Sequence, residues 1–79
     1  MDVQNVFDII VRHTREVVPG LEGHTFQFSN SLQDLGANSV DRSEILLFTL
    51  ESLSLRVPLS EFSRAANMGE LARLIHAKL

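Results

Sequence analysis

The chain contains no cysteine, so neither a disulfide nor a thiolate metal ligand contributes to its stability. Tryptophan and tyrosine are also absent, which leaves five phenylalanines as its only large aromatic residues. Basic residues are few, since seven Lys and Arg against ten Asp and Glu give a net charge of −3. A nucleic-acid-binding domain normally carries a basic stripe on its surface. The composition therefore argues against nucleic acid as a partner.

Long apolar runs are missing as well. The longest purely apolar stretch is residues 45–48, whereas a transmembrane helix needs about 20 such residues. Asp2 and Asp8 occupy the N-terminal stretch, where a secretory signal would place basic residues before a long apolar run. We therefore expect no membrane partner, and the cytoplasm is the default location.

What the sequence does contain is 79 residues, of which 44% are apolar and 22% charged, a composition typical of a globular protein. No repeat, low-complexity tract or linker interrupts them, so residues 1–79 are predicted to form a single domain that works as a monomer. A core of this size leaves only about 3–5 kcal/mol of net stability.

The first half of the chain predicts one helix and one long loop. Apolar residues recur at steps of three and four over residues 3–18, and the Pro-Gly pair at residues 19–20 ends the pattern. Residues 21–38 form a connection rich in Gly, Ser and Asn, in which residues 31–35 are expected to make a single helical turn before a glycine. The apolar anchors expected to hold this loop on the core are Phe26, Phe28, Leu32 and Leu35.

A second long helix is predicted to begin at Asn38 or Ser39 and to run to about Leu53. Asn38 suits the N-cap position, and Asp41 complements the positive end of the helix dipole. The stripe expected to be buried comprises Ile45, Leu46, Thr49, Leu50 and Leu53.

The last third predicts two more helices. Pro58 precedes a short helix over residues 59–65, anchored by Leu59 and Phe62. Residues 67–70 show a capping-box pattern with Asn in place of Ser or Thr, and a final helix follows. Its expected apolar face comprises Leu71, Leu74, Ile75 and Leu79. Since no segment alternates as a strand would, the predicted fold is all-α, a small bundle of three longer helices and one short helix.

Residues 34–45, Asp-Leu-Gly-Ala-Asn-Ser-Val-Asp-Arg-Ser-Glu-Ile, resemble the phosphopantetheine-attachment motif of acyl carrier proteins. The resemblance covers nearly the whole chain, because the order and spacing of the predicted helices also agree. It implies a bundle of the acyl-carrier type and a carrier rather than an enzyme. It further implies that a phosphopantetheinyl transferase esterifies Ser39 with 4′-phosphopantetheine. An anion is favoured at a helix N-terminus, where that residue lies.

Two plainer interpretations of these residues stay open. Ser39 is an ordinary N-cap if the chain is only a helical interaction module. His13, His24 and His76 have no metal-ligand spacing, and the sequence has no Gly-x-Ser-x-Gly elbow for a serine hydrolase. We therefore expect neither a catalytic residue nor a metal site in this chain.

A second stripe on the predicted helix after Asn38 resembles the acidic recognition helix of carrier proteins. Carboxylates around an exposed apolar pair attract basic enzyme surfaces and then provide a hydrophobic contact. The alternative is an ordinary solvated helix face. The residues expected to recognise partner enzymes are Val40, Asp41, Glu44, Leu47 and Glu51.

Residues 36–44 are most similar to the free-standing donor carriers of polyketide β-branching cassettes. This resemblance implies an acetyl group, made by decarboxylating a malonyl thioester, and as partners an acyltransferase, a decarboxylating ketosynthase and a synthase like HMG-CoA synthase. Acceptor carriers of that pathway typically have tryptophan six residues after the serine, where this chain has Ile45. Asn38 and Arg42 depart from the usual aspartate and acidic positions of the family. Carriers of fatty-acid, lipoyl-precursor, other polyketide or aminoacyl intermediates remain alternatives.

Overall fold

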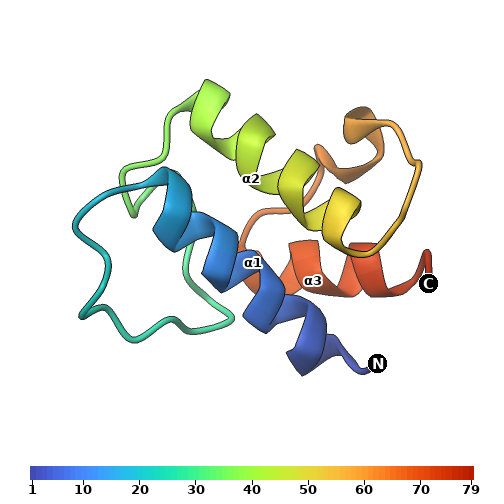
Figure 1. The fold of residues 1–79 in the computed structure, drawn as a ribbon, viewed down its shortest axis with the longest axis horizontal. Coiled ribbons are helices and arrows are strands. Elements are labelled where there is room, and N and C mark those ends of the chain that lie inside the picture. Colours follow the sequence, from blue (N-terminus) through green and yellow to red (C-terminus); the bar gives the residue numbers. More distant parts are fainter.

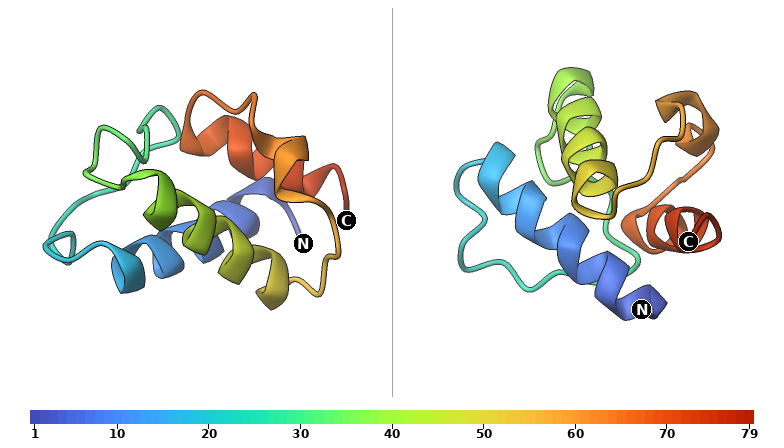
Figure 2. Two further views of the ribbon diagram at one scale, coloured as in Figure 1. Left: turned by 90° about the horizontal axis from the view of Figure 1, so that it is seen from above. Right: turned by 45° about the vertical axis from the view of Figure 1, so that its right-hand side comes forward.

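The computed structural model describes residues 1–79 and contains three α-helices, one 3₁₀ helix and no strand (Figure 1). In chain order these elements are α1 (Val3–Val17), α2 (Ser39–Ser52), η1 (Leu59–Phe62) and α3 (Met68–His76). α1 packs against both α2 and α3, and η1 contacts both α2 and α3 (Figure 2). The predicted all-α bundle of three longer helices and one short helix is confirmed. No helix combines the length and the apolarity that crossing a bilayer requires.

The buried core is one cluster to which all three α-helices contribute. Its fully buried apolar side chains are Val6, Ile10, Ile45, Met68, Ala72 and Ile75. Two buried threonines lie among them, and each hydroxyl donates to the carbonyl oxygen four residues earlier in its helix. Thr14 donates to Ile10 at 2.7 Å and Thr49 donates to Ile45 at 2.8 Å. A threonine can therefore occupy the core without leaving a buried hydroxyl unsatisfied.

Several residues predicted to be buried are only partly covered. Leu35, Leu46 and Leu53 are half-buried and pack against the edge of the core. Leu79 is wrongly placed by the sequence pattern, since it is 53% exposed. It follows the end of α3 at His76, so the helical spacing no longer decides which way its side chain points.

The long loop keeps its predicted turn. The N–H of Gly36 donates to the carbonyl of Gln33 at 3.1 Å, and the N–H of Ala37 donates to that of Leu32 at 3.0 Å. This pair of bonds is the usual end of a helical turn whose last residue is followed by one with a positive φ. Gly36 takes that position, with φ +100°. The turn buries Leu32 and delivers the chain to the start of α2.

The predicted short helix is shorter than expected and of a different type. It is a 3₁₀ helix over Leu59–Phe62 and does not reach residue 65. Phe62 is buried as predicted, but Leu59 is 37% exposed and does not act as an anchor. The hydroxyl of Ser63 donates to the Ser60 carbonyl at 3.0 Å, a local bond that competes with continuation of the helix.

The N-terminus of α3 is capped, but only half of the expected capping box forms. The Asn67 side chain accepts from the Glu70 N–H at 2.8 Å. The Glu70 carboxylate accepts from the N–H of Ala66 at 3.3 Å rather than from that of the N-cap residue. The donor of the reciprocal bond is therefore Ala66, one residue before the N-cap.

Candidate functional site

Ser39 is the first residue of α2, and the N-cap is its neighbour Asn38. The Asn38 side chain accepts from the Asp41 N–H at 2.8 Å, while the Asp41 carboxylate accepts from the Asn38 N–H at 3.2 Å. This reciprocal capping box confirms Asn38 as the predicted N-cap of α2, and Ser39 takes no part in it. The Ser39 side chain is exposed and makes no hydrogen bond within the protein, so the capping interpretation of Ser39 is wrong.

The backbone around Ser39 favours a negative charge. The first N–H groups of a helix have no intrahelical partner and carry the positive end of its dipole. In α2 the N–H of Asp41 is bonded to the Asn38 side chain and that of Arg42 to the Asn38 carbonyl. The N–H groups of Ser39 and Val40 have no partner in the protein. Two unpaired N–H donors, those of Ser39 and Val40, therefore lie beside the exposed hydroxyl of Ser39.

Ser39 also lies on the edge of an open groove of about 530 Å³. The groove is formed by residues 31–33 of the long loop, the first two turns of α2, η1 and the start of α3. Eight of its 15 lining residues are hydrophobic, among them Leu46 and Phe62. Arg42 is the only charged residue in the lining. Sequence reasoning did not predict this groove, because its walls come from four segments that meet only in the folded chain.

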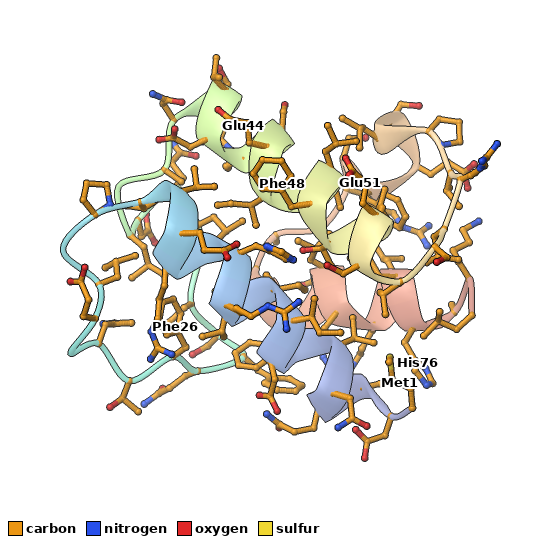
Figure 3. All side chains as sticks on the ribbon, in the orientation of Figure 1. Met1, Phe26, Glu44, Phe48, Glu51 and His76 are labelled. Carbon is orange, nitrogen blue, oxygen red and sulfur yellow. The ribbon has the colours of Figure 1, made fainter.

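The predicted recognition stripe lies on the outer face of α2, which continues from Ser39. Val40 is 63% exposed and Leu47 is 45% exposed, although both are apolar. Glu44 and Glu51 are exposed along the same helix (Figure 3). Asp41 differs from the others, because it is half-buried and its carboxylate accepts the capping hydrogen bond. The structure thus brings four of the five residues together as an exposed face.

The three histidines lie outside this site, and none of them lines the groove. His13 forms a hydrogen-bonded chain, with Nδ1 2.6 Å from Glu16 Oε1 and Nε2 2.8 Å from Ser52 Oγ. His24 Nε2 lies 3.1 Å from Asn30 Oδ1. No group of three or more His, Cys, Asp or Glu side chains is placed to hold a metal ion.

His76 contacts the other end of the chain. Its Nε2 lies 3.0 Å from the carbonyl oxygen of Met1, beside which it is labelled in Figure 3. The contact joins the two ends of the chain. Because the two residues are 75 positions apart, no local sequence pattern indicates it.

Comparison with known proteins decides the family. No family model matches the chain. Over all 79 residues it is 44% identical to a polyketide biosynthesis acyl-carrier-protein, AcpK, of Bacillus subtilis (strain 168), and it covers 96% of that protein. The chain belongs to the acyl carrier protein family. The family predicted from residues 34–45 is thereby confirmed.

The structure of this carrier agrees with a solved relative over its whole length. It matches a chain in the crystal structure of the curacin biosynthetic pathway HMG synthase in complex with acetyl donor-ACP, with a TM-score of 0.95 and 44% identity. The match covers 99% of the carrier and 100% of that chain. Since a 79-residue carrier covers the whole of the matched chain, the likeness is to the carrier component of that complex. The predicted resemblance to donor carriers is confirmed.

Proposed function

We propose that this carrier holds an acetyl group on a phosphopantetheine arm at Ser39 and presents it to a synthase like HMG-CoA synthase in polyketide β-branching. The observation that carries the proposal is the full-length likeness to an acetyl donor carrier solved with an HMG synthase. When bound, the arm supplies the thiol for a thioester, a group that this cysteine-free chain lacks.

The residues around Ser39 fit such an arm. Attachment forms a bond between Ser39 Oγ and the phosphorus atom of coenzyme A that carries pantetheine. The pyrophosphate bond of coenzyme A breaks, adenosine 3′,5′-bisphosphate leaves together with the hydroxyl proton, and a negatively charged phosphodiester remains on the serine. Because Asn38 holds the cap, this change removes no hydrogen bond from the fold. The unpaired N–H groups of Ser39 and Val40 and the helix dipole stabilise the added charge.

The exposed face of α2 is the proposed docking surface for partner enzymes. An enzyme that receives the end of the arm has to approach the α2 N-terminus, where Val40 is the exposed apolar residue beside the arm. Glu44 and Glu51 attract a basic enzyme surface, and Leu47 then adds a desolvated contact. We assign four partners to this face: the phosphopantetheinyl transferase, an acyltransferase, a decarboxylating ketosynthase and the synthase. In this proposal residues 1–79 work as one monomeric domain in the cytoplasm.

Attachment is tested by mass spectrometry after incubation with coenzyme A and a broad-specificity phosphopantetheinyl transferase. Ser39→Ala is compared with Ser43→Ala, a matched control because Ser43 lines the same groove one turn further along α2. We expect the wild type and Ser43→Ala to gain one arm and Ser39→Ala to gain none. An arm on Ser39→Ala, or none on the wild type, would contradict the assignment.

The acetyl-donor role needs a second assay. Acetyl-loaded carrier is mixed with an HMG-CoA synthase-like enzyme and an acceptor β-keto thioester, and the same carrier loaded with a long acyl chain is the control. We expect turnover of the acetyl form alone. Equal turnover of both forms would assign this protein to a carrier of another pathway.

A further inference from the structure

Arg42 is a half-buried cation without an acidic partner, one helical turn from Ser39. Its guanidinium Nη1 donates to the Ala37 carbonyl oxygen at 2.9 Å, which is its only side-chain hydrogen bond in the structure. It forms no ion pair, and the neighbouring carboxylate of Asp41 accepts the capping bond of Asn38 instead. Arg42 lines the groove, and its positive charge has no ion-pair partner in the protein.

The other cationic side chains have different surroundings. Lys78 forms an ion pair with Glu61 at 2.6 Å. Arg15 lies 5.0 Å from the ring centroid of Phe26, and Arg73 lies 5.5 Å from that of Phe28. None of the six other Lys and Arg side chains, which also include Arg12, Arg56 and Arg64, lines the groove beside Ser39. Arg42 is thus the one cation placed to interact with a group attached there.

We propose that Arg42 is a positioning residue, which pairs with the phosphodiester on Ser39 and thereby restrains the direction in which the arm leaves the start of α2. The inference rests on the proposed attachment at Ser39. Residues three apart on a helix are neighbours, about 5–6 Å apart at Cβ, so the guanidinium reaches a phosphoryl group on the serine oxygen. Four of its five N–H donors remain available after the bond to Ala37.

The bond to Ala37 explains why an arginine suits this position. A guanidinium held at one nitrogen by a carbonyl has already lost part of its rotamer freedom, so less entropy is lost when it binds an anion. Its planar fork also matches phosphate oxygens better than an ammonium does. A lysine would keep the charge but could not use one nitrogen for Ala37 and the others for phosphate in the same fixed geometry.

The test compares apo and holo forms of the wild type, Arg42→Gln and Arg42→Lys, with Arg64→Gln as the control. Arg64 is exposed and does not line the groove, so its substitution removes the same charge without touching the site. Intact mass establishes that each holo form is fully loaded. The readouts are the phosphorus NMR resonance of the arm and the change in Tm between the apo and holo forms, neither of which depends on enzyme activity.

We expect the arm to raise the Tm of the wild type by roughly 2–4 °C, as a partly exposed charge pair would. Arg42→Gln should lose this rise and shift the phosphorus resonance, Arg42→Lys should lie between, and Arg64→Gln should match the wild type. In about 1 M salt, where the screening length falls to about 3 Å, the difference between the wild type and Arg42→Gln should shrink.

Identical phosphorus resonances and equal holo-minus-apo Tm changes in fully loaded wild type and Arg42→Gln would overturn the role of Arg42. The same loss in Arg64→Gln as in Arg42→Gln would also overturn it, because a general charge effect would then suffice. Failure of the wild type to gain the arm is a different result, visible in the mass alone, and it overturns the attachment site itself.

Discussion

The N–H of Gly69 donates a 2.8 Å hydrogen bond to the carbonyl oxygen of Phe28, and the Phe28 side chain occupies the space beside the glycine Cα. A Cβ at position 69 would lie 2.8 Å from Phe28 Cβ and 3.0 Å from its carbonyl oxygen. The preceding N–H, that of Met68, donates to the Asn30 carbonyl at 2.8 Å. The long loop thus supplies acceptors to the first N–H groups of α3, which have no partner within the helix. The same loop forms one wall of the groove at Ser39.

Gly69→Ala should destabilise the protein although alanine has the higher helix propensity. The gain in propensity is about 1 kcal/mol, but the new methyl group contacts backbone and Cβ atoms that cannot rotate away. The close contact places the overpacking cost near the upper end of about 1–3 kcal/mol, so we expect a net loss of about 1–2 kcal/mol in urea unfolding. Gly23→Ala is the control, because a Cβ there meets nothing within 4 Å. Equal stability of Gly69→Ala and wild type would show that the loop around Phe28 can shift away from α3 and make room for the methyl group without a loss of stability.

Leu50→Ala should remove most of the net stability. Leu50 is 3% exposed and belongs to the core cluster between α2 and its neighbours. Truncation of a buried leucine costs about 2–5 kcal/mol, against about 3–5 kcal/mol available to a core of this size. We expect the far-ultraviolet circular dichroism signal to melt well below the wild-type Tm. A loss below about 1 kcal/mol would contradict the burial of this residue.

Leu47→Ala separates recognition from folding. Leu47 lies on the same helix as Leu50 but is 45% exposed, so its truncation should change stability by less than about 1 kcal/mol. We expect a slower acetyl transfer to the synthase, because the variant loses an apolar contact at the proposed docking face. The measurement is the transfer rate of the acetyl-loaded variant beside that of wild type. Equal rates would show that recognition lies on another surface.

Glu51→Lys tests the electrostatic part of the same face. Glu51 is exposed and makes no ion pair within the carrier, so its charge is available to a partner. Reversal of that charge should slow association with a basic enzyme surface, and the deficit should shrink as salt screens the interaction. Transfer rates at low and high ionic strength provide the measurement. A deficit that does not depend on salt would point to a steric rather than an electrostatic cause.

Ser52→Ala tests the contact between the C-terminal parts of α1 and α2. Ser52 Oγ lies 2.8 Å from Nε2 of His13, whose side chain is only 12% exposed. The variant loses this bond and the longer one, 3.5 Å, that Arg12 Nη2 donates to the same hydroxyl, which should lower the free energy of unfolding by about 0.5–1.5 kcal/mol. Ser60→Ala is the control, because the Ser60 hydroxyl makes no hydrogen bond within the protein. Equal stabilities of the two variants would show that water replaces the histidine contact without loss.

The features predicted correctly depend on neighbours in sequence. α1 ends where Pro19 follows, and α2 begins after the cap at Asn38, because caps and turns are decided by a few adjacent residues. The motif around Ser39 is local in the same way. The errors fall where local preference is weak, as in the short segment after Pro58, which became a four-residue 3₁₀ helix.

By itself the sequence determined the three α-helices, most of their apolar faces and the serine at the start of one of them. Helical periodicity and capping are properties of residues no more than four positions apart, so they can be followed along the chain. Only the tertiary structure decided that Gly69 lies against Phe28, that His13 contacts Ser52 39 positions away, and that Arg42 lines the groove beside Ser39. These relationships depend on how separate segments pack, and no local pattern encodes the distance between two side chains that meet only in the folded core.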